Sequence, residues 1–543
     1  MLKVLTAEEM REVDRLTTEK YGIPSILLME NAAHAAARVI TEKLGGSVEG
    51  KSFLILCGKG NNGGDGAALA RILTLQGANV FTNLFAKVEE TKGDASINFK
   101  ILRSQGSIDY QQWNWFEFEE FESFDEWKRM FTRYFKTNKV DCFVDACFGT
   151  GFSRPIKGIA GLIIEFFYNL KTNNEKSLIY ISLDLPSGLN ADSAEAKDTN
   201  FHADLTVTFT APKPANVLPP ASNFNGELVV AHIGSPQELI DNSPSKLFLA
   251  EKQDAQSWLE RTRFTTDSYK NKRGHALLIV GSREYTGAAV LAGNAAMLSG
   301  VGLTTIATSE SAQMAIVAKV LEEVITRRLP ETENGAISVE AFAAVEKLIE
   351  KIDVVGIGCG LSSGEKTTRD FVREVVVKRK TPVVIDADAL NALSPFDLQG
   401  SDDLPLILTP HEGEFLRLLG TKDKDAMKDR VKAVRDFAEK HQVILVLKGE
   451  RVLIAAPDGT VVVNPTGNAG LGKAGNGDTL TGIITGFIAQ AVPMKIDIYE
   501  TVVAAVYLSG LAGDIAAKKF GMRSMLASDV RECLQTGFAA VEK

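Results

Sequence analysis

The residues best suited to chemistry lie in a glycine-rich run, residues 464–482, which leads into an apolar helical pattern over residues 480–489. This arrangement predicts that residues 475–478 form a helix N-terminus, where unpaired backbone N–H groups bind anions. Such groups can stabilise a phosphoryl group during its transfer, because negative charge develops there. Asp478 beside them can accept the proton of an attacking hydroxyl. The run therefore predicts phosphoryl-transfer chemistry, and a glycine-rich turn without function would hardly need this aspartate.

Further polar residues of the C-terminal half follow predicted buried strands. His411 and two acidic residues come directly after residues 406–408, and Lys448 follows residues 444–447. The carboxyl ends of parallel strands meet at one edge of a sheet, where ligands bind. A lone histidine is more often structural than catalytic, and a lone lysine is usually just solvated. At such an edge, however, Lys448 also offers a cation to nucleotide phosphates.

A second glycine-rich run, residues 57–66, follows an apolar strand over residues 52–57 and precedes a predicted helix over residues 67–76. Glycine permits tight turns and a close approach of the backbone to a ligand, and a helix N-terminus attracts phosphate. On its own this signal is weak. Two more polar clusters, at residues 145–155 and 184–189, also follow predicted strands. Three clusters at one sheet edge predict a ligand site.

The elements that must position these residues alternate between short apolar strands and helical patterns in both halves. Continuous apolar strands are typical of parallel sheets buried on both faces, so two layered α/β domains are expected. Residues 233–252 are polar and without period, which places the boundary between domains 1–240 and 241–543. An aromatic and acidic segment, residues 107–138, interrupts the first domain; packing against its parent domain or a sister subunit is the favoured interpretation. The main strands are predicted at residues 140–144, 179–183, 205–209, 276–280, 303–307, 354–357, 383–385, 406–408, 444–447 and 452–455.

Composition excludes several classes of protein. With 543 residues the chain is too long for one ordinary core. A formal charge of −9 argues against a general nucleic-acid binder, which needs a basic face. Five widely spaced cysteines without a metal-ligand pattern fit a reduced protein. The N-terminus lacks a signal-peptide pattern, and the longest apolar stretch, residues 480–492, is too short to span a bilayer. We expect a soluble cytoplasmic protein without nucleic-acid or membrane partners.

The N-terminal half, over about residues 1–235, resembles the NAD(P)HX epimerases, also called YjeF N-terminal domains. Besides the three clusters, residues 21–24 and 28–32 carry the resemblance. It implies a Rossmann-like domain that holds a potassium ion and inverts the hydroxyl-bearing carbon of a hydrated nicotinamide. Asp184 would lie at the reacting end and either exchange protons there or only anchor ligand hydroxyls. The implied substrate contacts are Asn61, Asn62, Gly63, Gly64, Asp65, Gly149, Thr150, Gly151, Phe152, Ser153, Arg154, Pro155 and Asp184, and the implied K⁺ ligands are Asn62, Asp145 and Ser187.

The C-terminal half, over roughly residues 265–540, resembles the ribokinase-like fold and, within it, the ADP/ATP-dependent NAD(P)HX dehydratases. Residues 272–275 and 287–289 add to the motifs above. The resemblance implies that Asp478 deprotonates the ring hydroxyl, which takes a phosphoryl group from ADP or ATP with Mg²⁺. Loss of phosphate then regenerates the reduced nicotinamide. The implied NAD(P)HX contacts are Ala289, Gly360, His411 and Asp478, and the implied nucleotide contacts are Lys448, Gly449, Glu450, Arg451, Val452, Gly475, Asn476 and Gly477.

Two residues depart from the pattern of this family. Ala474 stands where the family usually has the first glycine of a pair, which is tolerable if its φ is negative. Lys473 beside it is also unusual, and either contacts phosphate or faces water.

Together the resemblances predict a bifunctional enzyme that repairs NADHX and NADPHX, and the family and the aromatic segment suggest a homo-oligomer. A ribokinase-like small-molecule kinase, fused to a ligand-binding YjeF N-terminal module, is the main alternative. A non-enzymatic N-terminal half is a second. A dehydrogenase is a weak third, because no acidic residue ends the strand over residues 79–85 to recognise a ribose. The preferred nucleotide, ADP or ATP, and the preferred hydrate are open at this point.

Overall fold

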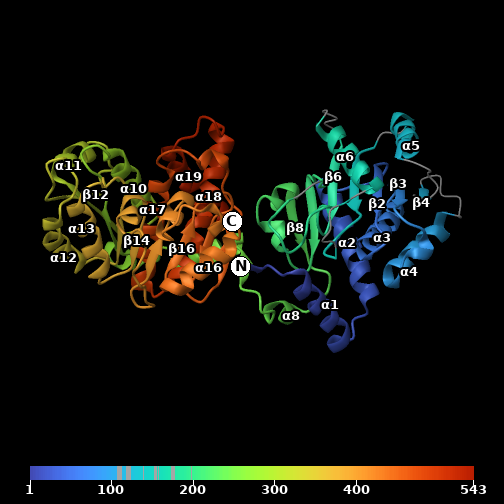
Figure 1. The fold of residues 1–543 in the computed structure, drawn as a ribbon, viewed down its shortest axis with the longest axis horizontal. Helices are drawn as coiled ribbons and strands as arrows, with labels where there is room; N and C mark the ends of the chain where they lie inside the picture. The colour runs from blue at the N-terminus through green and yellow to red at the C-terminus, as the bar shows by residue number, and fades with distance from the viewer. Residues whose placement is uncertain are drawn as a thin grey trace. The chain divides into compact units, whose positions relative to one another are not determined.

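The chain folds into two compact units, Leu2–Ser245 and Lys246–Lys543, each with its own sheet (Figure 1). The computed structural model describes residues 1–106, 113–117, 124–137, 140–151, 156, 158–172, 178–196 and 199–542. Both units are α/β with parallel strands at their centre, which confirms the predicted fold class.

The N-terminal sheet has the strand order β4-β3-β2-β5-β6-β7-β8, and every described pair is parallel. Its order reverses between β2 and β5, and ligands of open α/β sheets bind in the crevice at such a reversal. The strands are β2 (Ser52–Cys57), β3 (Asn79–Leu84), β4 (Trp113–Glu117), β5 (Cys142–Ala146), β6 (Ile179–Leu183), β7 (Leu205–Phe209) and β8 (Glu227–Ala231). The helices are α1 (Ala7–Tyr21), α2 (Ser25–Lys43), α3 (Asn61–Leu75), α4 (Gly93–Gly106), α5 (Phe124–Thr137), α6 (Gly158–Thr172), α7 (Pro214–Val217) and α8 (Gln237–Asp241).

Helix α3 begins at Asn61, so the prediction that residues 61–66 form a loop before a helix at residue 67 was wrong. Glycine is a poor helix former, which is why the sequence pattern indicated a loop. Tertiary packing demands the glycines instead. A Cβ on Gly63 would lie 1.6 Å from the Gly58 carbonyl oxygen, and one on Gly66 would lie 2.6 Å from the Ala146 Cβ. The glycines therefore let the first turns of α3 press against the strand ends of the sheet.

The described part of the aromatic segment packs against its own domain, as the favoured interpretation held. Strand β4 pairs with β3 in the sheet. On α5, Trp127 is fully buried and its Nε1–H donates to Asn83 Oδ1 at 2.9 Å. Its ring stacks on Phe131 and meets Phe166 of α6 edge-on. The other residues of this segment lie outside the described ranges.

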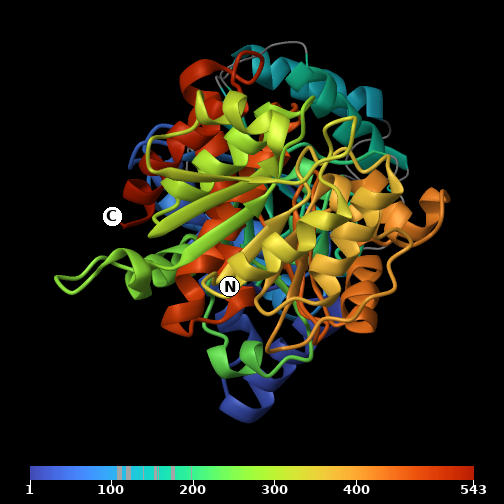
Figure 2. The same ribbon diagram turned by 90° about the vertical axis from the view of Figure 1, so that its left-hand side faces the viewer.

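The strands that residues 246–543 contribute to the C-terminal sheet have the order β9-β18-β17-β16-β15-β14-β13-β10-β11-β12, with helices packed against them (Figure 2). Strands β10 to β16 are parallel, whereas β17 runs antiparallel to both of its neighbours. The strands are β9 (Leu247–Leu249), β10 (His275–Ile279), β11 (Leu303–Ser309), β12 (Val324–Leu329), β13 (Val354–Ile357), β14 (Val383–Ile385), β15 (Leu406–Leu408), β16 (Ile444–Leu447), β17 (Leu453–Ala455) and β18 (Val461–Val463). The helices are α9 (Lys252–Arg261), α10 (Thr286–Leu298), α11 (Glu310–Val317), α12 (Phe342–Ile349), α13 (Lys366–Val377), α14 (Ala387–Ala392), α15 (Glu412–Leu418), α16 (Arg430–His441), α17 (Asn476–Met494), α18 (Ile498–Phe520) and α19 (Ala527–Glu542).

Helices α17 and α18 supply much of the core of this unit. Ile484 of α17 and Val503 of α18 are buried in one apolar cluster with Val446 of β16. Within the described part of the chain, α18 is the helix long and apolar enough to cross a membrane, but 61% of its most apolar window is buried inside the protein. Its apolar residues are therefore accounted for by packing in the core.

Candidate active sites

The first site gathers at the carboxyl ends of β5, β6 and β7, next to the reversal of the N-terminal sheet. Asp145, near the end of β5, is 1% exposed. Its carboxylate accepts the Ser187 backbone N–H at 2.7 Å and the Ser187 hydroxyl at 2.6 Å. The structure thus brings together two of the three residues that the sequence assigned to potassium.

The third predicted potassium ligand, Asn62, stands at the start of α3. Its side-chain Oδ1 and Nδ2 are both buried and, among the described residues, without a hydrogen-bond partner. Buried polar groups are rarely left unpaired unless an ion or water satisfies them. Burial also raises the pKa of Asp145, although Ser187 donates to it. An amide oxygen without a donor and a buried carboxylate fit a hard cation such as K⁺, which prefers oxygen ligands.

Asp184 follows β6 and is held in a buried ion pair. Its Oδ1 accepts Lys213 Nζ at 2.5 Å and the Thr208 hydroxyl at 3.2 Å, and its Oδ2 accepts the Thr150 N–H at 3.2 Å. Lys213 is 1% exposed. The backbone of Asp184 has φ of +63°, which is uncommon for a residue other than glycine and is frequent at functional sites. The structure therefore joins the predicted residues Asp184 and Thr150.

Lys213 was overlooked when site residues were predicted from the strand ends. Like Asp184, it follows a predicted strand at the edge of the sheet where ligands bind. It lies four residues beyond the end of β7, on the edge where the other clusters follow β5 and β6. Its ammonium also donates to the Thr208 hydroxyl at 2.9 Å and the Phe209 carbonyl at 3.1 Å. These contacts fix its ammonium against Asp184.

Two further carboxylates act on the Asp184–Lys213 pair. Burial raises the pKa of Asp14, on α1, to about 6; the Asp184 charge adds to this and the Lys213 charge opposes it. Burial, together with the charges of Asp184 and Asp14, raises the pKa of Asp65 well above its usual range. One lysine therefore lies among three carboxylates, two of which, Asp14 and Asp65, have raised pKa values. A carboxyl with a pKa of about 6, such as that of Asp14, can give and take protons near neutral pH.

The remaining predicted residues of this half divide into two groups. Asn61 is exposed at the first turn of α3, whereas Gly63 and Gly64 are buried. A Cβ on Gly64 would lie 2.8 Å from the Ala95 Cα, so this glycine is needed for helix packing. Phe152, Ser153, Arg154 and Pro155 lie outside the described residues.

The second candidate site is the N-terminus of α17, and the prediction that residues 475–478 form a helix N-terminus is confirmed. Gly475 is the N-cap with φ of +89°, and Asp478 stands in the first turn. The structure does not place Ala474 at positive φ, so alanine is tolerated where the family has glycine. Burial raises the pKa of Asp478 to about 6; a contact with Cys359 lowers it, Asp386 raises it and Lys448 lowers it. A carboxyl with this pKa can act as a general base near neutral pH.

Lys448 faces this helix end, but it is not the solvated lysine that its sequence context allowed. Its Nζ lies 2.6 Å from Asp386 Oδ1, and Asp386 Oδ2 accepts the Thr481 hydroxyl at 2.8 Å. Burial alone would lower the pKa of Lys448, but the Asp386 and Glu414 carboxylates outweigh it and raise that pKa. A Cβ on Gly477 would lie 3.5 Å from the Lys448 Nζ. The Lys448 ammonium therefore lies beside the backbone of the helix N-terminus and is held by Asp386, to which the sequence pattern assigned no role.

His411 caps a helix, and its side chain is also partly exposed. It is the N-cap of α15, and its Nδ1 accepts the backbone N–H groups of Gly413 at 3.0 Å and Glu414 at 3.3 Å. In the neutral ring the proton then resides on Nε2, which leaves Nε2–H as a donor. The side chain is 56% exposed. The backbone N–H of Lys448 donates to the Pro410 carbonyl at 2.8 Å, so the predicted histidine and lysine lie on neighbouring strand ends.

Other predicted contacts have mixed outcomes. Gly360 follows β13 with φ of +66°, and a Cβ there would lie 2.7 Å from the Tyr285 Cβ. Ala289 is fully buried in an apolar cluster on α10. The Lys473 side chain does not simply face water, because its Nζ donates to the carbonyls of Arg523 and Met525.

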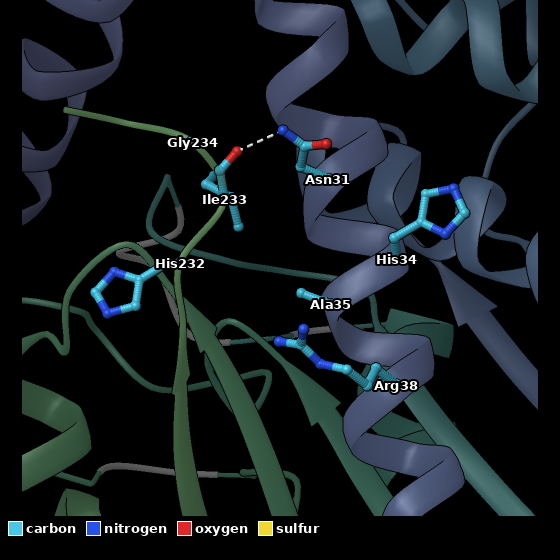
Figure 3. Close-up of a pocket in the computed structure, with 7 residues that line it drawn as sticks. All are labelled: Asn31, His34, Ala35, Arg38, His232, Ile233 and Gly234. Carbon is cyan, nitrogen blue, oxygen red and sulfur yellow. Dashed lines mark hydrogen bonds between the residues drawn. The ribbon is translucent and has the colours of Figure 1, made fainter.

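Another pocket, of about 400 Å³, lies on the N-terminal unit between α2 and the chain after β8 (Figure 3). Asn31 Nδ2 donates across it to the Ile233 carbonyl at 2.7 Å. None of the predicted site residues lines it. Its lining residues are Asn31, His34, Ala35, Arg38, His232, Ile233 and Gly234.

Fold and sites together define an enzyme of two α/β domains, one with an acid–base carboxylate cluster and one with a base, a cation and a helix N-terminus. Family models agree: NAD(P)H-hydrate dehydratase matches residues 276–536, and YjeF-related protein N-terminus matches residues 25–215. The bifunctional NAD(P)H-hydrate repair enzyme of Moorella thermoacetica is 38% identical over 98% of this chain and 96% of its own length. That of Thermofilum pendens is 32% identical over 100% and 97%.

The ADP/ATP-dependent NAD(P)H-hydrate dehydratase from Bacillus subtilis, co-crystallised with ATP and Mg²⁺, is 31% identical; the match covers 54% of this chain and 99% of that chain, with a TM-score of 0.47. The chain belongs to the family of bifunctional NAD(P)H-hydrate repair enzymes. The predicted family and fold class are therefore confirmed.

Proposed function

We propose that the chain repairs NADHX and NADPHX in two steps. The N-terminal domain, residues 1–240, interconverts the R and S hydrates, and the C-terminal domain, residues 241–543, dehydrates the S hydrate at the expense of ADP or ATP with Mg²⁺. One observation carries the second step: Asp478, with a pKa of about 6, stands in the first turn of α17 beside the Lys448 ammonium. A base, an anion-binding helix end and a cation meet at one point.

In the dehydratase reaction, Asp478 takes the proton of the ring hydroxyl as its oxygen attacks the terminal phosphoryl group of the nucleotide. The N–H groups of residues 475–477 and the Lys448 ammonium stabilise the charge on the transferring group. The hydroxyl has then become a phosphate ester, which leaves far more readily than hydroxide. Departure of phosphate and loss of a ring proton restore the reduced nicotinamide. We propose Ala289, Gly360, His411 and Asp478 as substrate contacts, and Lys448, Gly449, Glu450, Arg451, Val452, Gly475, Asn476 and Gly477 as nucleotide contacts.

In the epimerase reaction, Asp184 gives and takes the protons that inversion of the hydroxyl-bearing carbon requires, and Lys213 holds this carboxylate in place. Asp14 and Asp65, whose pKa values are raised, serve as the partner acids. Potassium, held by Asn62, Asp145 and Ser187, would contribute fixed positive charge. We propose as substrate contacts Asn61, Asn62, Gly63, Gly64, Asp65, Gly149, Thr150, Gly151, Phe152, Ser153, Arg154, Pro155 and Asp184. The formal charge of −9 fits an enzyme with small-molecule partners and no nucleic-acid partner, and we propose that it is cytoplasmic and homo-oligomeric.

The test is the absorbance near 340 nm, which reports reduced nicotinamide. Both hydrate epimers are incubated with the protein, Mg²⁺ and either ADP or ATP. Recovery beyond the share of one epimer, faster than spontaneous epimerisation, supports both activities. Asp478→Asn should abolish dehydration alone, and Asp184→Asn should abolish epimerisation alone. Absence of recovery with either nucleotide would favour the small-molecule kinase, which shares the base and the helix end but releases a phosphorylated product.

A further inference from the structure

Arg430, the first residue of α16, reaches the turn that follows β16. Its Nη1–H donates to the Glu450 carbonyl at 2.9 Å. Its Nη2 also lies close to the neighbouring Gly449, where φ is +150°. A Cβ on that glycine would lie 3.1 Å from the Arg430 Nη2. On the other side, Nε lies 3.9 Å from Glu412 Oε1, one residue beyond His411. One guanidinium thus contacts both the turn of residues 448–451 and the start of α15.

These contacts bury part of a cation whose N–H donors are not all paired, and packing alone does not explain this unfavourable burial. Nε and Nη2 are buried and donate no hydrogen bond within the described part of the chain. Burial lowers the pKa of Arg430, although the carboxylates of Glu412 and Glu450 oppose this. Burying a cation with unpaired donors is unfavourable, and native proteins keep such groups where function requires them.

We propose that Arg430 is a positioning residue for the nucleotide: it fixes the turn of residues 448–451 in the shape that receives the phosphates of ADP or ATP. The proposal rests on the proposed nucleotide-dependent dehydration. Lys448 alone supplies charge, but its ammonium is already paired with Asp386. Arg430 holds the backbone of the next two residues, so it sets the direction in which that turn presents its N–H groups. A planar guanidinium suits this task because its donors have fixed directions.

The same helix offers a matched control. Arg435 of α16 also donates to a backbone carbonyl, that of Gly459 at 2.8 Å, but it braces the turn between β17 and β18. Both arginines are partly buried. If Arg430 served only to hold α16 in place, loss of either side chain would affect the enzyme alike.

The experiment compares Arg430→Ala, Arg430→Lys and Arg435→Ala in the full-length protein. Arg430→Ala should raise the KM for nucleotide roughly tenfold, the scale of one charge-assisted hydrogen bond, with little change in kcat or in the KM for hydrate. Arg430→Lys should also bind the nucleotide weakly, because an ammonium lacks the planar set of N–H donors that a guanidinium has. Millimolar guanidinium should restore Arg430→Ala and leave Arg435→Ala unchanged. The epimerase activity of each variant reports that the chain is folded.

Calorimetric titration with ADP, without hydrate, separates this proposal from the proposed function. Weaker ADP binding in Arg430→Ala than in Arg435→Ala supports the positioning role even if dehydration is not observed. Equal ADP affinity in the two alanine variants would overturn the proposal while leaving nucleotide-dependent dehydration intact. A fall in kcat with an unchanged nucleotide KM would also overturn it.

Discussion

Replacing Asp478 with asparagine is expected to stabilise the C-terminal unit while removing its activity. The pKa of Asp478 is raised from 3.8 to about 6, so the folded protein binds its proton more tightly than the unfolded chain does. Stability from this carboxyl is therefore fully present below pH 3.8 and is lost as the pH rises through 6. Above pH 6 the ionised group is a net cost, which an uncharged asparagine avoids.

The size of the effect follows from the shift. About two pKa units correspond to about 3 kcal/mol of unfolding free energy at pH 7.5. At pH 4 most of the difference disappears, because the group is then almost fully protonated in the folded protein and about 40% protonated in the unfolded chain. A domain of this size gains about 2 °C in Tm for each kcal/mol, so the variant should melt about 6 °C higher at pH 7.5.

The assay is scanning calorimetry of the wild type and of Asp478→Asn at pH 4 and pH 7.5. The control is Asp403→Asn, which removes an exposed carboxylate of the same unit and should leave the Tm nearly unchanged at both values. An Asp478→Asn variant that is less stable than wild type at pH 7.5, or equally stabilised at pH 4, would refute the reasoning. The carboxylate would then be stabilised by its surroundings and poorly suited to act as a base.

Three further outcomes are expected. Dehydratase kcat/KM should fall about tenfold for each pH unit below 6 as Asp478 becomes protonated, and a profile flat to pH 5 would contradict this assignment. Lys213→Met should abolish epimerisation and lower the unfolding free energy of the N-terminal unit by about 3–5 kcal/mol, measured by urea denaturation, because it leaves a buried carboxylate unpaired. KCl should raise the Tm of that unit above its value in choline chloride, and Asn62→Ala should remove the difference; an equal response in wild type and variant would argue against a potassium site there.

The sequence by itself determined the elements whose signal is local. The apolar runs at residues 179–183, 205–209, 354–357, 383–385, 406–408 and 444–447 are strands with those bounds, because continuous burial in a parallel sheet requires apolar side chains on both faces. The glycine-rich run before α17 is a helix N-terminus with Asp478 in its first turn, since glycine allows the φ of +89° at the cap. Strand ends and helix caps depend on a few consecutive residues, and they could therefore be predicted from the sequence.

The tertiary structure decided what depends on residues distant in the chain. The start of α3 at Asn61 follows from close packing of Gly63 and Gly66 on the strand ends, which no local propensity reveals. Contacts across the fold also set the charges of both sites. Asp386 reaches Lys448 across 62 residues, and the surroundings of Asp14 come from residues nearly 200 positions away. A pKa depends on burial and on neighbouring charges in space, and therefore only the folded chain specifies it.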